Sequence, residues 1–329
     1  LLLENRNMRS LLETTSRKQL IIGNSLVMRQ QLDMLRQVAN SEANVLLLGD
    51  SGTGKELFAR QLHQWSRRAD RVFIPFNCAA LPRELAEAEL FGHEKGAFTG
   101  AHKERPGIFR EAHNGTLLLD EVGELDPALQ SKLLRVLQEG EVRPVGGSRS
   151  VDVDVRIVTA SNADLEGMVR DGTFREDLYY RLNVITMKLP RLTERSDDIP
   201  LLADFFLSKY TEKNRREIEG IGRGAMDVLT AHSWPGNVRE LENVIERAVV
   251  LAKGALLEEG DLPDALFAEP SGEGAITLPM GTSMEEMEKT MLNQTLKLTR
   301  GNKKLAAQLL GISLRTVYRI LDRQQGVEE

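Results

Sequence analysis

A glycine-rich run follows an apolar stretch at 44–48 and has the composition of a phosphate-binding loop. Its residues are Gly49, Asp50, Ser51, Gly52, Thr53, Gly54 and Lys55. Glycines let backbone N–H groups turn toward phosphate oxygens, and the start of a following helix adds positive potential. Lys55 is expected to reach the β- and γ-phosphates of a nucleotide. A turn that binds nothing is the alternative, but the strand-then-helix setting is the one that a phosphate site requires.

Carboxylates near this loop are the candidates for metal binding and catalysis. Glu56 stands where the generic motif has the serine or threonine that binds Mg²⁺, so another group must hold the metal, directly or through water. Asp120 and Glu121 end the apolar run 117–119, at the carboxyl end of a predicted strand. Asp120 would then lie near the metal, and Glu121 would orient or deprotonate the attacking water. Two solvated acids at a strand end are the alternative, which the phosphate loop disfavours.

Apolar runs and helical patterns predict the elements that position these residues. The apolar runs are 44–48, 72–76, 116–120 and 153–160. Helical stretches such as 56–66 and 127–139 separate them, and continuous apolar strands between helices indicate a parallel sheet covered on both faces. Beyond residue 189 the strand signals fade, and the pattern predicts a smaller helical domain. Its helices are 199–210, 224–232 and 238–252.

Composition and pattern together suggest how the chain divides. We predict a helical linker over 1–18, an α/β domain over 19–190, a helical domain over 191–268, a flexible linker over 269–282 and a terminal helical domain over 283–329. The chain opens on Leu1 rather than on methionine, so we expect the first linker to follow an upstream regulatory domain.

The overall composition excludes several classes of protein. The chain has 329 residues, of which 41% are hydrophobic and 28% charged, as in ordinary globular proteins. The single cysteine, Cys78, excludes an internal disulfide framework and fits a reducing cytoplasm. No apolar run approaches the roughly 20 residues that cross a bilayer, so no membrane partner is expected. The net charge of −6 argues against nucleic acid as a partner of the whole chain, but basic residues gather near its C-terminus.

This basic region predicts a DNA-binding helix-turn-helix. Its predicted helices are 284–298, 303–310 and 313–322. Gly311 lies in the turn, Ser313 is a natural N-cap for the last helix, and Val317 and Ile320 are expected to pack inward. The candidate DNA contacts are Lys303, Lys304, Ser313, Arg315, Thr316, Tyr318, Arg319 and Arg323. Such modules bind double-stranded DNA as dimers, with the first helix as the expected dimer surface. A helical hairpin that only dimerises is the alternative, which the basic excess disfavours.

A hexapeptide in the first domain resembles the signature of a known family. It consists of Gly96, Ala97, Phe98, Thr99, Gly100 and Ala101, the GAFTGA motif of bacterial enhancer-binding proteins. These sigma-54-dependent activators, of the nitrogen-regulatory-protein-C class, are AAA+ ATPases. Three further segments and the Fis-type C-terminal region also resemble the family. The segments are 89–95, 174–182 and 234–241. The resemblance implies an α/β AAA+ domain with a parallel sheet between helices, a helical lid and an all-α helix-turn-helix domain.

The resemblance also implies roles for side chains outside the phosphate loop. Asn77 would restrain Glu121 as a switch, and Asn162 would sense the γ-phosphate. Arg239 would contact the nucleotide from the lid, and Glu56 is usual in the family.

Two arginines, Arg175 and Arg181, lie in the segment that resembles the family's arginine finger. By resemblance they would reach into a neighbour's ATP site, within a closed ring most often of six subunits. Phosphoryl transfer is catalysed by positioning and charge stabilisation, so an arginine supplied in trans makes hydrolysis depend on assembly. Surface salt bridges are the alternative role, and the sequence does not choose between the two arginines.

The hexapeptide has no titratable side chain and predicts a mobile loop with an aromatic tip. An exposed Phe98 makes sense as a contact for a partner, although residue physics alone leaves open a buried phenylalanine in an ordinary turn. By resemblance the partner is sigma-54, and Thr99 is also essential to the contact. A second loop at 139–147 resembles the family's second pore loop.

Together with these observations, the resemblance implies a cytoplasmic transcription activator, belonging to a two-component system. By the same resemblance, it would use ATP and Mg²⁺ to remodel the closed complex of sigma-54 RNA polymerase from upstream DNA sites. Two other functions stay open on the fold alone: an ATP-modulated repressor that works without sigma-54, and a different AAA+ remodeller such as a helicase loader. The hexapeptide 96–101 separates the first function from the other two.

Overall fold

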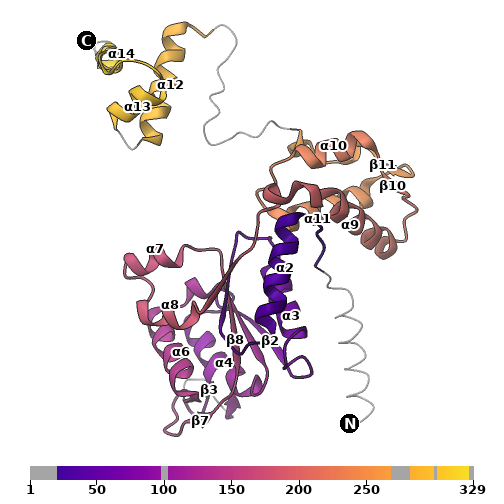
Figure 1. Ribbon diagram of the computed structural model, residues 1–329, viewed down its shortest axis with the longest axis vertical. Helices are drawn as coiled ribbons and strands as arrows, with labels where there is room; N and C mark the ends of the chain where they lie inside the picture. The colour runs from indigo at the N-terminus through magenta and orange to yellow at the C-terminus, as the bar shows by residue number, and fades with distance from the viewer. Residues whose placement is uncertain (1–20, 98–102, 268–281, 300–301, 326–329) are drawn as a thin grey trace. The chain divides into compact units, whose positions relative to one another are not determined.

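The computed structural model describes residues 21–97, 103–267, 282–299 and 302–325 (Figure 1). These residues belong to two compact units, which divide between Leu266 and Phe267. The predicted linker 1–18 and nearly all of the predicted linker 269–282 lie outside the described residues.

A five-stranded parallel sheet forms the centre of the first unit. Its strands are β1 (Val45–Leu48), β2 (Phe73–Asn77), β5 (Thr116–Asp120), β8 (Arg156–Ser161) and β9 (Ile185–Lys188). They stand in the order β2-β5-β8-β1-β9, and every pairing is parallel. The carboxyl ends of all five strands therefore meet at one edge, where ligands of such sheets bind.

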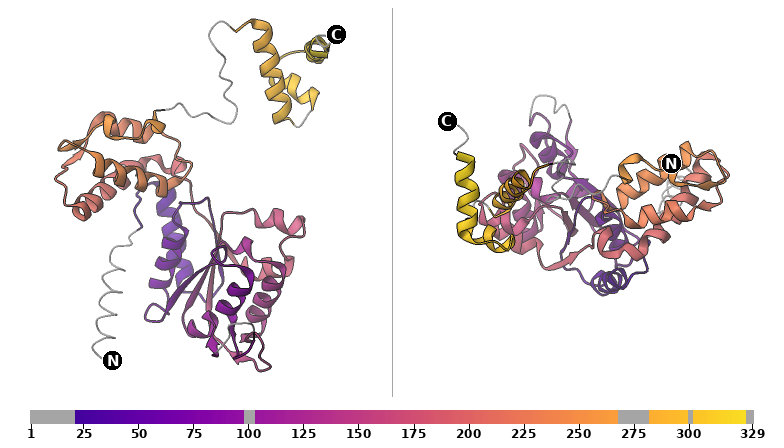
Figure 2. Two further views of the ribbon diagram at one scale, coloured as in Figure 1. Left: turned by 180° about the vertical axis from the view of Figure 1, so that it is seen from behind. Right: turned by 90° about the horizontal axis from the view of Figure 1, so that it is seen from above.

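Helices cover both faces of this sheet, because successive strand residues point to opposite sides (Figures 1 and 2). Leu118 and Val158 pack on one face with side chains of α2 and α3. Leu117 and Ile157 pack on the other face with side chains of α4, α6 and α8. The helices of this part are α2 (Leu26–Ala39), α3 (Lys55–Gln64), α4 (Arg83–Phe91), α5 (Ile108–Glu111), α6 (Pro127–Glu139), α7 (Leu165–Arg170) and α8 (Glu176–Leu182). The predicted parallel sheet between helices is confirmed.

The structure corrects the predicted strands in two places. The strand expected over 153–160 begins only at Arg156, because Asp154 turns to the surface and pairs with Arg68 at 2.7 Å. Strand β9 has no counterpart among the predicted strands. It is short, and Met187 is its only fully buried residue, so its apolar signal is weak.

Two short antiparallel strand pairs stand at the bases of the two predicted loops. They are β3 (Gly92–His93) with β4 (Arg105–Pro106), and β6 (Glu141–Val142) with β7 (Val151–Asp152). The Glu94 amide donates to the Val145 carbonyl at 3.0 Å, and the Val145 amide donates to the Gly92 carbonyl at 2.8 Å. These bonds join the base of the hexapeptide loop to the second loop.

A helical subdomain completes the first unit. Its elements are η2 (Leu192–Asp198), α9 (Ile199–Asn214), β10 (Gly220–Ile221), α10 (Arg223–Ala231), α11 (Asn237–Leu251), β11 (Leu256–Leu257), η3 (Glu259–Asp261) and η4 (Asp264–Leu266). Trp234 is buried in its core with Phe206 and Leu241. The indole N–H of Trp234 donates to the Leu229 carbonyl at 2.8 Å, which satisfies its one polar atom.

A buried carboxylate ties this subdomain to the start of α2. The Asp198 carboxylate accepts hydrogen bonds from the amides of Asn24 and Ser25, at 2.6 and 2.8 Å, and from the Ser25 hydroxyl at 2.7 Å. Asp198 is 1% exposed, so no water can replace these bonds. The Ser25 hydroxyl in turn caps α2 by accepting from the Met28 amide.

Replacing Asp198 by alanine is expected to lower the free energy of unfolding by about 3 kcal/mol, because it leaves buried donors without an acceptor. Urea denaturation measures the change. Asp197→Ala is the matched control, since Asp197 is exposed and has no side-chain partner among the described residues. Equal effects of the two substitutions would show that the Asp198 bonds do not stabilise the junction.

The second unit is a small bundle of three helices. They are α12 (Met284–Leu298), α13 (Lys303–Leu309) and α14 (Leu314–Gln325). Leu292, Ala307, Val317 and Ile320 form its core, as expected for the two inward-facing residues of the last helix. In the described parts of both units, no helix has the length and apolar character needed to cross a membrane.

Candidate functional site

The phosphate-binding loop connects β1 to α3, as its sequence predicts. Gly52 and Gly54 have φ values of +80° and +102°, which side chains rarely adopt. A Cβ on Gly52 would lie 2.2 Å from the Gly236 carbonyl oxygen, so the loop and the start of α11 approach too closely for any other residue. Lys55 opens α3, and its Nζ donates to the Gly49 carbonyl at 2.8 Å and to the Asp50 carbonyl at 3.3 Å.

A pocket of about 480 Å³ opens above this loop. Its lining residues include Ser51, Gly52, Thr53, Gly54, Lys55, Glu56, Asn77, Asp120, Glu121 and Arg239. Further residues extend it with apolar surface from the helical subdomain and the start of the described chain. They include Ile21, Ile22, Leu202, Phe205 and Phe206. The volume and the mixture of an apolar end with a polar, phosphate-binding end fit a nucleotide.

The predicted catalytic carboxylates lie at the carboxyl end of β5. Asp120 faces Asn77 across the β2–β5 pairing. Asp120 Oδ1 accepts from the Glu121 amide at 3.1 Å, and Glu121 has a left-handed backbone with φ +54°. Such a conformation costs a non-glycine residue about 1 kcal/mol or more and often marks functional positions. The side-chain oxygen of Asn77 accepts from the Ala79 amide at 2.8 Å, and the described side chains of Asn77 and Glu121 share no hydrogen bond.

Burial and nearby charges shift the pKa values of Lys55, which lines this pocket, and of the neighbouring Cys78. Burial lowers the pKa of Lys55, and the nearby carboxylates of Glu121 and Asp120 act in the opposite direction. Lys55 is 7% exposed, so a bound polyphosphate would meet a cation that water screens poorly. The neighbouring Cys78 is buried, and its pKa is raised to about 12, chiefly by burial. Cys78 is therefore a packed thiol and not a nucleophile.

The first turn of α11 contacts the phosphate loop directly. Arg239 Nη1 donates to the Ser51 hydroxyl at 2.8 Å, and Asn237 Nδ2 donates to the Ser51 carbonyl at 3.0 Å. From η2, Arg195 Nη2 donates to the Thr53 carbonyl at 3.2 Å. Arg239 is a predicted site residue, whereas Asn237 and Arg195 are not. Both are buried polar residues of the helical subdomain, and only long-range contacts reveal them.

Some predicted residues lie apart from the pocket lining. Asn162 follows β8 and is exposed, and it does not line the pocket. Asp50 pairs with Arg191 at 2.7 Å on the surface of the loop. In the hexapeptide, Gly96 and Ala97 belong to the described residues, whereas the remaining predicted contacts do not. Those outside are Phe98, Thr99, Gly100 and Ala101.

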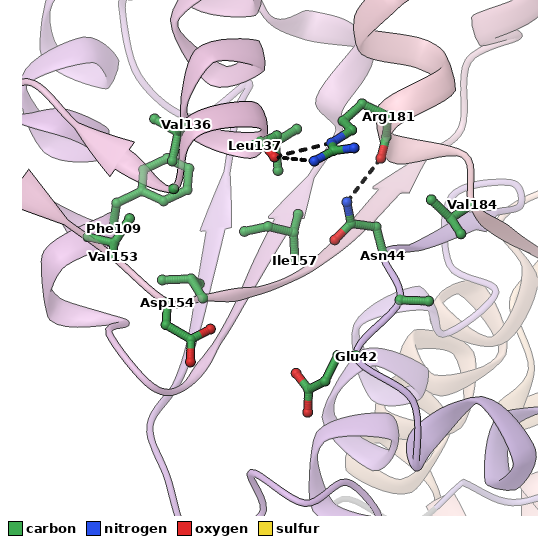
Figure 3. Close-up of a pocket in the computed structure, with 13 residues that line it drawn as sticks. Glu42, Asn44, Phe109, Val136, Leu137, Val153, Asp154, Ile157, Arg181 and Val184 are labelled. Carbon is green, nitrogen blue, oxygen red and sulfur yellow. Dashed lines mark hydrogen bonds between the residues drawn. The ribbon is translucent and has the colours of Figure 1, made fainter.

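The two candidate finger arginines are bonded very differently. Arg175 forms a two-point ion pair with the Asp177 carboxylate, at 3.0 and 2.7 Å. Arg181 has no carboxylate partner in the described part of the chain; its Nε and Nη2 donate to the Leu137 carbonyl at 3.1 and 2.9 Å (Figure 3). The Arg181 carbonyl accepts from Asn44 just before β1, at the amino edge of the sheet. Neither arginine lines the nucleotide pocket of its own chain.

Large apolar side chains are exposed beside Arg181. Tyr180 is 66% exposed and Val184 is 57% exposed. Together with Arg181, Val184 lines a pocket of about 350 Å³ at the amino edge of the sheet (Figure 3). Exposed aromatic and aliphatic groups around an arginine are typical of a protein-binding surface.

The predicted DNA contacts lie on α13, on α14 and at the cap of α14. The Ser313 hydroxyl accepts from the Thr316 amide at 3.1 Å, which confirms Ser313 as the cap of α14. Lys303 lies over the Tyr318 ring, with its Nζ 4.7 Å from the ring centre. The remaining candidates with described side chains, Lys304, Arg315 and Arg319, are exposed. Arg323 lies on α14, but its side chain is outside the described residues.

Comparisons with protein families match nearly the whole described chain. A family model described as the sigma-54 interaction domain matches residues 21–188. One described as the AAA+ ATPase lid domain matches 193–277, and one described as bacterial regulatory protein, Fis family, matches 283–323.

Comparisons with individual proteins agree with these family matches. The transcriptional regulatory protein ZraR of Salmonella typhimurium is 49% identical over 308 residues, covering 92% of this chain and 68% of ZraR. The regulatory protein AtoC of Escherichia coli is 48% identical over 320 residues, covering 95% of this chain and 69% of AtoC. The crystal structure of NtrX from Brucella abortus with ADP is 37% identical, with a TM-score of 0.72, covering 97% of this chain and 72% of NtrX. NtrX has also been solved with ATP, with a TM-score of 0.72.

Proposed function

Because this chain belongs to the family of sigma-54-dependent transcriptional activators, with an AAA+ ATPase domain and a Fis-type helix-turn-helix, we propose that it is a ring-forming ATPase. Its subunits would share their ATP sites, and hydrolysis would drive the remodelling of the closed complex of sigma-54 RNA polymerase. The observation that carries this proposal is the split of the catalytic groups. The phosphate loop, the carboxylates and Arg239 line one pocket, whereas Arg181 lies outside it and has no charged partner within the described segments.

The pocket residues fit ATP, which crystals of the related NtrX contain. Loop amides and Lys55 would hold the phosphates, and Arg239 and Arg195 would bind from the helical side. Among the described residues, no three His, Cys, Asp or Glu side chains group as in a protein metal site. Asp120 would therefore hold Mg²⁺ together with nucleotide phosphates, as is usual for this ion. The ion would neutralise charge on the phosphates.

Glu121 and Asn77 line the pocket as their proposed roles require, whereas Asn162 does not. Glu121, which follows the carboxyl end of β5, would accept a proton from the attacking water. Asn77 stands beside Asp120 across the strand pairing, within the same pocket, where a change of rotamer would let it restrain Glu121. Asn162, exposed after β8, would approach the γ-phosphate only on a rearrangement of that turn.

Arg181 is the arginine that we propose as the finger. It would exchange two hydrogen bonds to a neutral carbonyl for a bidentate bond to phosphate, which is the stronger interaction. Arg175 already has a bidentate carboxylate partner within the same chain. The exposed Tyr180 and Val184 beside Arg181 provide the apolar contact that a neighbouring subunit would cover.

The hexapeptide would couple hydrolysis to sigma-54. Its base is hydrogen-bonded to the second loop, which begins where α6 ends, and α6 also supplies the Leu137 carbonyl bound by Arg181. A finger that moves toward a neighbour's phosphates would release α6 and thereby shift both loops. Upstream DNA would be held by the second unit as a dimer, through exposed α13 and α14 residues, with Met284 and Met291 exposed on α12 for pairing.

Phe98→Ala is expected to keep ATP hydrolysis within about threefold of the wild type and to abolish transcription by sigma-54 polymerase, because the proposed role of Phe98 is a contact with sigma-54 and not catalysis. Steady-state assays measure the rate of ATP hydrolysis, and a reconstituted assay measures transcription by sigma-54 polymerase. Activation by the wild type with loss in Phe98→Ala supports the proposal. Regulation of a promoter without sigma-54 would favour a repressor, and full activation by Phe98→Ala would remove the hexapeptide from the contact.

A further inference from the structure

A groove of about 380 Å³ runs along α11 next to the nucleotide pocket. Its lining comprises Ser51, Gly236, Arg239, Glu240, Asn243, Val244, Arg247 and Pro263. Residues 239, 243 and 247 recur at the spacing of one helix face, so they form a continuous exposed row. The groove and the nucleotide pocket share Ser51 and Arg239. A neighbouring subunit that inserts a side chain into the nucleotide pocket beside Arg239 would therefore lie close to this row.

The charges of the groove are incompletely paired within the chain. Arg247 is exposed and has no ion-pair or side-chain hydrogen-bond partner among the described residues. Among the described residues, the one side-chain hydrogen bond of Arg239 goes to the neutral Ser51 hydroxyl. The groove's one carboxylate, Glu240, accepts a hydrogen bond from the Gly236 amide at 2.8 Å. The row therefore presents positive charge to whatever covers it.

The exposed face of α8 carries one carboxylate that could pair with this positive row. Leu178, Tyr179 and Leu182 are buried, so the opposite face presents Glu176, Asp177, Tyr180 and Arg181 to solvent. Asp177 is bound to Arg175, but Glu176 has no side-chain partner among the described residues. Glu176 is thus a carboxylate without a side-chain partner in the described chain, at one edge of the exposed side of α8, and Arg181 stands at the other edge.

The spans of the two surfaces differ by about 4.5 Å along the helix axes, a distance within reach of two long side chains. Glu176 precedes Arg181 by five residues, which is about 7.5 Å along a helix. Arg247 follows Arg239 by eight residues, or about 12 Å along α11, and the long side chains of Arg247 and Glu176 can close the difference. A neighbour whose Arg181 meets the phosphates beside Arg239 can therefore bring its Glu176 to Arg247. No hydrogen bond or ion pair joins the described residues of α8 and α11 within one chain.

We propose that Arg247 of one subunit pairs with Glu176 of the next copy of this chain, so that the α11 groove is the docking surface for α8. This inference rests on the proposed shared ATP site, and it assigns the contact that aligns the finger. Arg247 and Glu176 are positioning residues; neither touches the reacting phosphate.

Charge reversal in the full chain tests this pairing. Arg247→Glu and Glu176→Arg should each raise, by about tenfold or more, the protein concentration that gives half-maximal ATPase activity per subunit, because each places like charges together. The double variant Arg247→Glu/Glu176→Arg should return to within about threefold of the wild type. Light scattering with a non-hydrolysable ATP analogue should rank the variants in the same way, with the single variants assembling at higher protein concentrations than the wild type and the double variant. The affinity of each variant for that analogue should equal that of the wild type.

The controls are Arg223→Glu and Asp227→Arg, which reverse exposed charges on α10, a helix that lines neither pocket. Both control variants should reach half-maximal ATPase activity per subunit at the same protein concentration as the wild type. Single reversals that leave the concentration dependence unchanged, or a double variant as impaired as the sum of the singles, would overturn the pairing while the ring stands. A wild type whose activity per subunit is independent of concentration would overturn the shared site itself.

Discussion

Arg181→Ala should lower kcat for ATP hydrolysis by about 10³-fold or more, with little change in the affinity for ATP. The reason is that Arg181 lies outside its own nucleotide pocket and would stabilise transition-state charge only in a neighbour's site. Steady-state hydrolysis at saturating ATP and direct nucleotide binding measure the two quantities.

Arg170→Ala is the matched control, since Arg170 is an exposed arginine of α7 whose partner is Asp164 at 3.6 Å. It should keep nearly full activity. If Arg175→Ala shows the large loss and Arg181→Ala does not, the finger is Arg175 and its pair with Asp177 must open. If neither arginine matters, the site is complete within one subunit.

Glu121→Gln should lower kcat by about 10²- to 10⁴-fold, because the amide keeps the shape of the side chain but cannot accept the proton of water. ATP affinity should be unchanged or higher, as one negative charge near the phosphates is lost. Single-turnover hydrolysis with excess protein separates this effect from product release. Glu124→Gln, an exposed carboxylate of the following η1 turn (Val122–Glu124), is the control and should retain the wild-type rate. A fully active Glu121→Gln would remove Glu121 from proton transfer.

The groups that the sequence predicts well are those fixed by local chain geometry. The phosphate loop follows from an apolar strand, a glycine-rich turn and a helix start, all within 44–56. Asp120 and Glu121 follow from their place at the end of a buried strand. The cap of α14 by Ser313 likewise depends on a bond between neighbours in sequence.

The parts that the sequence did not predict depend on contacts between distant residues. Asp198 bonds to Asn24 and Ser25 across more than 170 positions, and Asn237 bonds to Ser51 across 186. No periodicity signals such pairs. The sequence pattern did not predict edge strand β9, because this strand is only partly buried. The different hydrogen-bond partners of Arg175 and Arg181 are known only from the structure.

Mixing two inactive variants tests the shared active site most directly. Glu121→Gln subunits retain Arg181, and Arg181→Ala subunits retain Glu121. In a random equimolar mixture, about one quarter of head-to-tail interfaces would combine an intact Glu121 with a neighbour's intact Arg181. The account predicts that hydrolysis recovers in the mixture, well above the mean of the two variants alone. Activity that stays at that mean, although the mixed subunits are shown to assemble, would contradict an arginine supplied in trans.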